Sequence, residues 1–175
     1  MNATQEALAR HRVVEALASV HDPEIPPCSI VDLGIVERVT VADELIEVDL
    51  LPTFAGCPAL DVILEDAESA VREVVPGREV RVRFVHSPAW TSDRITPAGR
   101  AALRTYGITP PGEAQPEGRT FISIEHVGRR ITCPFCGSDE TLLESAFGPT
   151  LCRSTHFCRS CRNPFEGFKP KASGR

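Results

Sequence analysis

The sequence predicts an α+β fold, with a small three-stranded sheet packed with helices, followed by a small C-terminal zinc-ribbon-like module. Apolar residues recur at helical spacing in two segments and alternate with polar residues in the strand-like segments. Two Cys-x-x-Cys pairs near the C-terminus are typical of a closed metal site. We therefore expect an α+β domain over residues 1–111, a linker over 112–128 and a metal module over 129–175.

The bulk composition is that of an ordinary globular protein, with 42% hydrophobic and 25% charged residues in a chain of 175. No apolar run approaches the roughly 18 residues of a membrane span. The first residues lack the basic and then apolar stretch of a secretory signal. Seven cysteines, four of them at metal spacing, fit a reducing compartment better than a disulfide framework. These features predict a cytoplasmic protein without a membrane partner.

The net charge is unevenly distributed along the chain. Residues 129–175 contain eight Arg or Lys and four Asp or Glu, a net of +4. Because the whole chain carries −5, the remainder carries −9. Four thiolates around one divalent cation would lower the charge of the tail by about two. A mildly basic tail on an acidic chain argues against nucleic acid as a partner, so a nucleic-acid-binding zinc ribbon is the weakest of the functions considered.

The predicted first domain begins with an amphipathic helix over residues 4–20, for which Thr4 is a suitable N-cap. Residues 22–27 contain three prolines and are expected to be irregular, because proline cannot continue a helix. Strands are expected over residues 34–41 and 45–51, with apolar residues on one face of the second.

The domain continues with a helix over residues 58–75, whose apolar residues line one side. A third strand is predicted around residues 80–84, where apolar residues alternate with arginines. Thr96-Pro97 has the form of a helix start and predicts a short helix to about residue 106, with Gly107 as its C-cap. The expected order is helix, strand, strand, helix, strand, helix.

The two cysteine pairs are the clearest chemical signal in the chain. Cys133 and Cys136 form the first pair, and Cys158 and Cys161 form the second, with residues 137–157 between them. Two such turns can complete a tetrahedron of thiolates around one cation. Gly137, directly after the first pair, can adopt the left-handed conformation that closes the turn. We predict a four-cysteine metal site on short antiparallel strands.

The ligand set favours Zn²⁺, because zinc prefers soft thiolates in closed tetrahedral sites. Iron in a rubredoxin-like site is the alternative, since the first turn has the form Cys-Pro-x-Cys-Gly. A module of about 40 residues cannot bury enough apolar surface to fold alone, so the metal should supply much of its folding free energy. Cys152 and His156 lie inside the module but outside both pairs, and we expect the quartet to exclude them as ligands.

A second type of cysteine environment occurs at Cys57, between a predicted strand and a predicted helix. Pro58 suits the first helical position, which would make Cys57 the N-cap. A thiol there would face unpaired amides and the positive end of the helix dipole, which favour the reactive thiolate. The alternative is a small buried hydrophobic residue, as free cysteine often is.

Two carboxylates, Asp22 and Glu24, lie in the proline-rich segment. Paired carboxylates can bind a metal or act as acid and base. Two solvated charges beyond a helix end are the simpler interpretation, and both remain open from these residues alone.

Several of these segments together resemble a known family. Asp22-Pro23-Glu24-Ile25-Pro26, the stretch from Ser29 to Gly34, and Pro52-Thr53-x-x-Gly56-Cys57-Pro58 are similar to the domain of iron–sulfur assembly factors such as SufT. Pro88-Ala89-Trp90-Thr91 and the cysteine pairs extend the match to essentially the whole chain. The chain thereby resembles the PaaD family, also called PaaJ, of bacterial phenylacetate catabolism.

The resemblance implies an accessory role in the phenylacetyl-CoA 1,2-epoxidase system, assisting iron–sulfur cluster assembly or delivery to its reductase component, which carries a [2Fe–2S] cluster and flavin. The family's reactive cysteine falls on Cys57, a predicted ligand of transient iron or cluster, with Asp22, Glu24 and Thr53 in support. The chain is then not a catalyst by itself. Either a homodimer sharing one cysteine per protomer or a complex with the client is expected. A non-catalytic structural subunit of the oxygenase complex is the alternative. A thiol oxidoreductase using Cys57 lacks an evident resolving cysteine.

Overall fold

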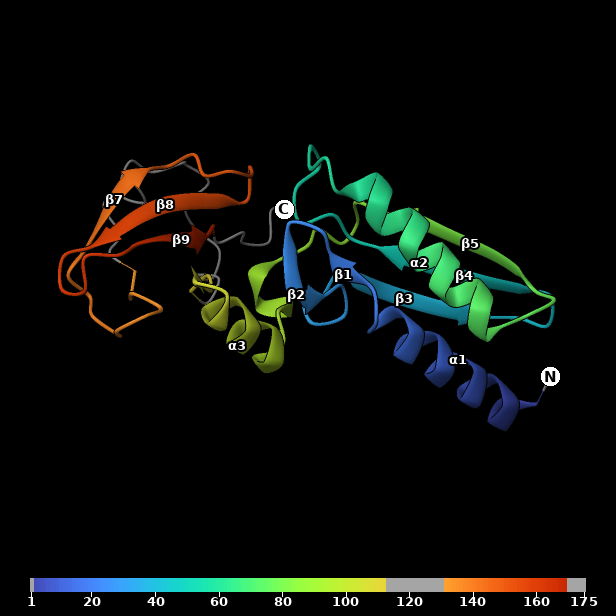
Figure 1. Cartoon of the computed structure of the whole chain (residues 1–175). Helices are drawn as coiled ribbons and strands as arrows, with labels where there is room; N and C mark the ends of the chain where they lie inside the picture. The colour runs from blue at the N-terminus through green and yellow to red at the C-terminus, as the bar shows by residue number, and fades with distance from the viewer. Residues whose placement is uncertain (1, 113–130, 170–175) are drawn as a thin grey trace. The chain divides into compact units, whose positions relative to one another are not determined.

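The computed structural model describes residues 2–112 and 131–169 of the chain (Figure 1). It contains two compact units, Met1–Trp90 and Thr91–Arg175. The elements of the first unit are, in order, α1 (Ala3–Leu17), β1 (His21–Asp22), β2 (Ile25–Ser29), β3 (Val36–Val41), β4 (Leu45–Leu50), α2 (Leu60–Val74) and β5 (Glu79–Phe84). No helix in the described ranges is long and apolar enough to cross a membrane.

The first unit is built on a three-stranded sheet, as the sequence predicted, and the order of its strands is β3-β4-β5. β3 and β4 are antiparallel neighbours, whereas β4 and β5 are parallel, with α2 as the crossover between them. α1 packs against β3 and α2, and α2 packs against β5, which gives one layer of helices and one of sheet (Figure 1). The core is apolar and includes the following buried side chains: Val13, Leu17, Ile46, Val48, Leu50, Ile63, Ala67, Val71 and Val80.

The proline-rich segment differs from its prediction. Instead of an irregular loop, residues 21–29 form an antiparallel pair in which Asp22 lies opposite Ile25 and His21 opposite Ser29. Pro26 and Pro27 are exposed on this two-stranded hairpin. Proline is compatible with such a position because an edge strand does not need every N–H in its ladder. The prediction of irregular structure was therefore wrong.

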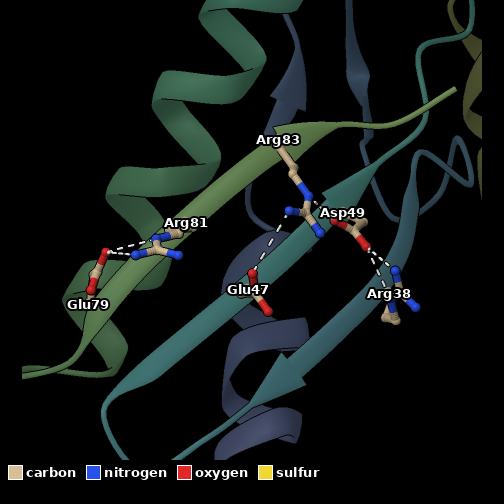
Figure 2. A network of polar contacts seen from close by, with 6 residues as sticks. All are labelled: Arg38, Glu47, Asp49, Glu79, Arg81 and Arg83. Atoms are coloured by element: carbon tan, nitrogen blue, oxygen red, sulfur yellow. Dashed lines mark hydrogen bonds and ion pairs between the residues drawn. The ribbon is translucent and has the colours of Figure 1, made fainter.

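Within residues 2–112 and 131–169, the outer face of this sheet carries charged side chains and no second layer of helices (Figure 2). Asp49 on β4 is only 3% exposed. It accepts two hydrogen bonds from Arg38 on β3, at 2.6 and 3.0 Å, and one from Arg83 on β5, at 2.7 Å. Burial raises the pKa of the Asp49 carboxyl, but the hydrogen bonds and charges of the two arginines outweigh it and hold that pKa below its usual range. Asp49 therefore ties all three strands together in its ionised form.

The second unit contains η1 (Ser92–Arg94), α3 (Pro97–Thr105), β6 (Ile108–Thr109), β7 (Thr141–Ser145), β8 (Arg153–Cys158) and β9 (Pro164–Phe168). Thr96 is the N-cap of α3, its Oγ1 accepting the N–H of Gly99 at 3.0 Å, which confirms the predicted helix start. The C-cap is Tyr106, and Gly107, one residue later, has a φ of 89°. The predicted C-cap was therefore one residue too late.

The second sheet has the order β6-β9-β8-β7. β7, β8 and β9 pair antiparallel, as predicted for the metal module, and β6 adds a short parallel pairing to β9. Ile108 and Thr109, which lie within the predicted bounds of the first domain, thus belong to the sheet of the second unit. The linker over residues 112–128 stays a prediction, because the described ranges stop at residue 112 and resume at 131.

Candidate functional site

The four paired cysteines meet in one cluster in the second unit. Cys158 ends β8, Cys161 follows in the turn to β9, and Cys133 and Cys136 lie in the turn before β7. The Sγ atoms of Cys133 and Cys161 are 3.7 Å apart, those of Cys136 and Cys158 are 3.6 Å apart, and all four lie within 4.8 Å of one another. A tetrahedron with metal–sulfur bonds of about 2.3 Å has edges of about 3.8 Å. The quartet therefore matches a four-thiolate metal site.

The two cysteine turns have the same backbone hydrogen bonds. In the first, Gly137 N donates to Cys133 O at 3.0 Å and Cys133 N to Ser138 O at 2.9 Å. In the second, Arg162 N donates to Cys158 O at 2.9 Å and Cys158 N to Asn163 O at 3.0 Å. We call these segments, residues 133–138 and 158–163, the first and second knuckle. Each presents two thiolates at a fixed spacing, which is why the site needs only two short turns.

Backbone amides point at the sulfur atoms inside the knuckles. N–H donation from Cys161 lowers the pKa of the Cys158 thiol to about 7, against the opposing effect of burial. At Cys136 the N–H of Ser138 also lowers the pKa, but burial and the neighbouring cysteines outweigh it and raise the value to about 12. A divalent cation bound here must therefore displace protons from the quartet.

The quartet is closed, because four protein thiolates leave no coordination position for a substrate. Its buried members Cys133 and Cys158 pack with Phe165 in a small apolar cluster, and Ile131 and Cys161 pack against this cluster. Such a site stabilises the fold of the ribbon and does not by itself provide a reactive metal.

Two residues of the ribbon lie outside the quartet, as predicted. His156 is buried, stacks on Phe165 with ring centroids 5.4 Å apart, and has its Nε2 2.9 Å from Ser154 Oγ. Burial lowers the pKa of His156. Cys152 is buried, with its Sγ 3.1 Å from Thr150 Oγ1. Both side chains are packing residues of the ribbon.

Cys57 lies in the loop between β4 and α2, but not at the predicted N-cap. The N-cap of α2 is Ala59, and its first helical residue is Leu60. Cys57 N donates to Phe54 O at 3.1 Å and Leu60 N approaches Cys57 O at 3.4 Å, so a turn precedes the helix. The N-cap prediction was wrong because Pro58 occupies that turn and not the first helical position. The Cys57 side chain is half-buried between the exposed residues Gly56 and Pro58.

The other predicted residues of this site lie in two segments at one end of the first sheet. Asp22 is buried at the end of β1, where its Oδ1 accepts the N–H of Glu24 at 2.8 Å. Thr53 is buried in the same loop as Cys57. Burial is the main cause that raises the pKa of the Cys28 thiol to about 11, and the negative charges of Asp32 and Asp22 add to it.

A run of backbone hydrogen bonds connects those two segments. Ile30 N donates to Val20 O at 2.9 Å, Ile35 N to Ile30 O at 2.9 Å, and Leu51 N to Ile35 O at 2.8 Å. The hairpin with Asp22 and Glu24 and the loop with Thr53 and Cys57 are thus anchored to the same end of the sheet. That the four side chains act together stays a prediction.

Two features of the ribbon were missed from the sequence. The second knuckle has Arg162 at a φ of 60°, and the loop between β7 and β8 exposes Phe147 to 78%. The first could have been found by aligning Cys-Pro-Phe-Cys-Gly with Cys-Arg-Ser-Cys-Arg, which places Arg162 where Gly137 stands. No periodicity marks the second, because exposure of a loop residue depends on the packing around it.

Comparison with known protein families divides the chain as its structure does. Residues 10–84 match the family described as iron–sulfur cluster assembly protein. Residues 121–169 match the PaaD zinc beta ribbon domain. The first match lies within the first compact unit, and the second includes all four cysteines of the quartet.

Individual relatives agree with both matches. A protein of Escherichia coli (strain K12), named as a proposed subunit of 1,2-phenylacetyl-CoA epoxidase, is 38% identical over 91% of this chain and 92% of its own. The Fe-S protein maturation auxiliary factor SufT of Staphylococcus aureus (strain USA300) is 35% identical over 48% of this chain and 96% of its own.

Among solved structures, the crystal structure of a DUF59 domain from Bacillus anthracis is similar, with a TM-score of 0.55 and 29% identity over 58% of this chain and 97% of that one. This chain matches the E. coli relative over nearly the whole length of both proteins. It also has an assembly-protein domain followed by a PaaD zinc beta ribbon, and these two findings together define its family. The chain belongs to the PaaD family.

Proposed function

We propose that this protein assists iron–sulfur cluster assembly or delivery to the reductase component of a phenylacetyl-CoA epoxidase system, in the cytoplasm. One observation supports the proposal most strongly. The chain joins an iron–sulfur assembly domain to a PaaD zinc ribbon, and its E. coli relative is named as an epoxidase subunit. The reductase is the component that needs a cluster, so it is the proposed client.

Cys57 is the proposed ligand for the transferred iron or cluster. Of the seven cysteines, four form the quartet, and Cys28 and Cys152 are buried. Cys57 is half-buried and is therefore the cysteine outside the quartet that solvent reaches. A ligand in an accessible loop can be exchanged, whereas the thiolates of the closed quartet cannot leave without unfolding the ribbon.

Transfer is proposed as thiolate exchange. A client thiolate forms a bond to iron as the bond from iron to Cys57 Sγ breaks, so the step needs no oxidant or reductant. Asp22, Glu24 and Thr53 are proposed to orient the loop that carries Cys57. One Cys57 from each of two protomers would supply a pair of ligands that can be exchanged. Zn²⁺ is the proposed metal of the quartet, which stabilises the ribbon and takes no part in exchange.

The test is anaerobic reconstitution of the apo reductase component with iron- and sulfide-loaded protein. Wild type should restore cluster content and reductase activity, and Cys57→Ser should not. Cys152→Ala is the matched control, because it removes a cysteine outside both sites. If Cys57→Ser matures the reductase as fast as wild type does, the carrier role is excluded.

A second candidate is a non-catalytic structural subunit of the oxygenase complex, favoured by the naming of the E. coli relative as a subunit. That role requires stable co-purification with the other components in a fixed ratio. A complex that forms with the apo reductase and dissociates once its cluster is present supports the assembly role instead.

A further inference from the structure

The loop between β7 and β8 presents two apolar side chains to solvent. Phe147 is 78% exposed and Leu151 is 51% exposed. Single exposed apolar residues are common on protein surfaces, but a large aromatic side chain exposed to this degree adds unfavourable contact with water. We call Phe147, Leu151 and the adjacent Lys169 the ribbon tip.

The backbone that carries Phe147 is rigidly held. Ser145 Oγ accepts the N–H of Phe147 at 3.0 Å and donates to its carbonyl oxygen at 2.9 Å. Gly148 N donates to Arg153 O at 2.9 Å, and Arg153 N donates to Thr150 O at 3.1 Å. A Cβ on Gly148 would lie 2.9 Å from the carbonyl carbon of Arg153, so the close turn requires glycine. Phe147 is thus held outward by a defined loop conformation.

Lys169 is fixed against the same loop. Its Nζ donates to Leu151 O at 2.9 Å and lies 5.4 Å from the centre of the Phe147 ring, and its backbone N–H donates to Cys152 O at 2.8 Å. Among residues 2–112 and 131–169, no carboxylate forms an ion pair with Lys169. The tip therefore combines two apolar anchors with one cation that has no ion-pair partner in those ranges.

We propose that the ribbon tip is a protein-docking surface, in which Phe147 and Leu151 enter an apolar socket with an acidic rim on the client component. The proposal rests on the proposed function, which supplies the client. Rigid aromatic anchors lose little conformational entropy on binding and often dominate interface energetics. A carboxylate on the rim would complement Lys169.

A protein surface fits the tip better than a lipid surface. Attraction to anionic lipid requires a cluster of about four to eight Lys or Arg. In the part of the chain that the structure describes, Lys169 is the accessible cation against this loop, since Arg153 is buried and paired with Glu166. The exposed Arg159 and Arg162 belong to the second knuckle, at the opposite end of β8. Among the described residues, one accessible cation thus stands beside two apolar anchors, an arrangement that suits a specific socket.

The experiment measures binding of full-length, metal-loaded protein to the purified apo reductase component by calorimetry. Phe147→Ser with Leu151→Ser should weaken binding at least about 30-fold, as loss of hot-spot residues does. Lys169→Glu should weaken client binding several-fold, and this loss should be smaller at high salt. Lys169→Arg should leave client binding unchanged. Leu8→Ser is the matched control, because Leu8 is 61% exposed on α1 of the other unit. Metal content and near-ultraviolet circular dichroism establish that each variant is folded.

Three outcomes would overturn the proposal: unchanged client binding by the folded double variant, self-association of wild type that the double variant loses, or co-sedimentation of wild type with phosphatidylglycerol–phosphatidylethanolamine vesicles that depends on Phe147. Cys57→Ser separates this inference from the proposed function. It should bind the client as wild type does but fail to transfer a cluster. Normal transfer by Cys57→Ser together with tip-dependent binding would exclude the carrier role and retain the docking surface.

Discussion

Gly137 and Arg162 occupy equivalent positions in the two knuckles, each donating its N–H to the carbonyl of the first cysteine of its pair. Both residues have positive φ values, 73° and 60°, but only one of them is glycine. The left-handed conformation costs a residue with a Cβ about 1–2 kcal/mol. The second knuckle therefore contains local strain that the first avoids.

Replacing Arg162 with glycine should relieve that strain. We expect Arg162→Gly to stabilise the metal-loaded protein by about 1 kcal/mol, measured by urea unfolding. Arg159→Gly is the control, because Arg159 is also exposed but has no positive φ, and its change should be neutral or destabilising. Equal effects of the two changes would show that charge and not backbone strain determines the result.

Removing the metal should unfold the ribbon selectively. Chelation at neutral pH, or Cys133→Ser, should abolish the native near-ultraviolet signal of the ribbon, because metal-binding free energy is folding free energy in so small a module. The metal should also be released more readily as pH falls, since protons compete for thiols such as Cys136, whose pKa is raised to about 12. A colorimetric chelator assay between about pH 5 and 8 measures this release, with the buried Cys152→Ala as control.

Asp49 should make stability depend on acidic pH. Its folded pKa is lowered, so the stabilisation is present above the unfolded pKa of about 3.9 and is lost as pH falls through the folded value. Asp49→Asn should cost about 1–2 kcal/mol at pH 7, because Arg38 and Arg83 are more than half exposed and solvent screens them. Urea midpoints of wild type and variant should converge as the pH falls through the lowered folded pKa of Asp49. Glu79→Gln is the control, because Glu79 and Arg81 are both 59% exposed, and little change is expected.

Cys28 and Cys57 should differ in reactivity. Brief treatment of the metal-loaded protein with iodoacetamide at about pH 8 should modify Cys57 and spare Cys28, which is fully buried and has a pKa raised to about 11. The pKa of the Cys28 thiol is near 9.0 in the unfolded chain and near 11 in the folded protein. Cys28 therefore stabilises the fold below pH 9, and this contribution is lost as the pH rises toward 11. Peptide mass spectrometry checks the labelling, and rapid modification of Cys28 would contradict the buried position.

Much of the fold was predictable from short-range patterns. Helical periodicity located α1 and α2, alternation located β4 and β5, and the Thr96-Pro97 signal located the start of α3. The metal quartet was predictable because two cysteines in each pair are neighbours in sequence, so their spacing already restricts the geometry.

Other features depended on contacts between distant segments. Pro26 and Pro27 indicated a break, yet they lie in a hairpin because edge strands can accommodate proline. Pro58 suggested a helix start at Cys57, but the turn before α2 extends to Ala59. Each error arose where a local signal was compatible with two backbone conformations and packing selected between them.

The sequence by itself determined the two-part architecture, the three-stranded sheet and two helices of the first unit, the cysteine quartet and the family resemblance, because these are encoded in spacings of a few residues. Only the tertiary structure decided that β6 joins the ribbon sheet, that backbone hydrogen bonds link the Asp22 hairpin to the Cys57 loop, and that Phe147 points into solvent. Those relationships join residues far apart in the chain, and their free energy comes from pairing and burial that no local pattern records.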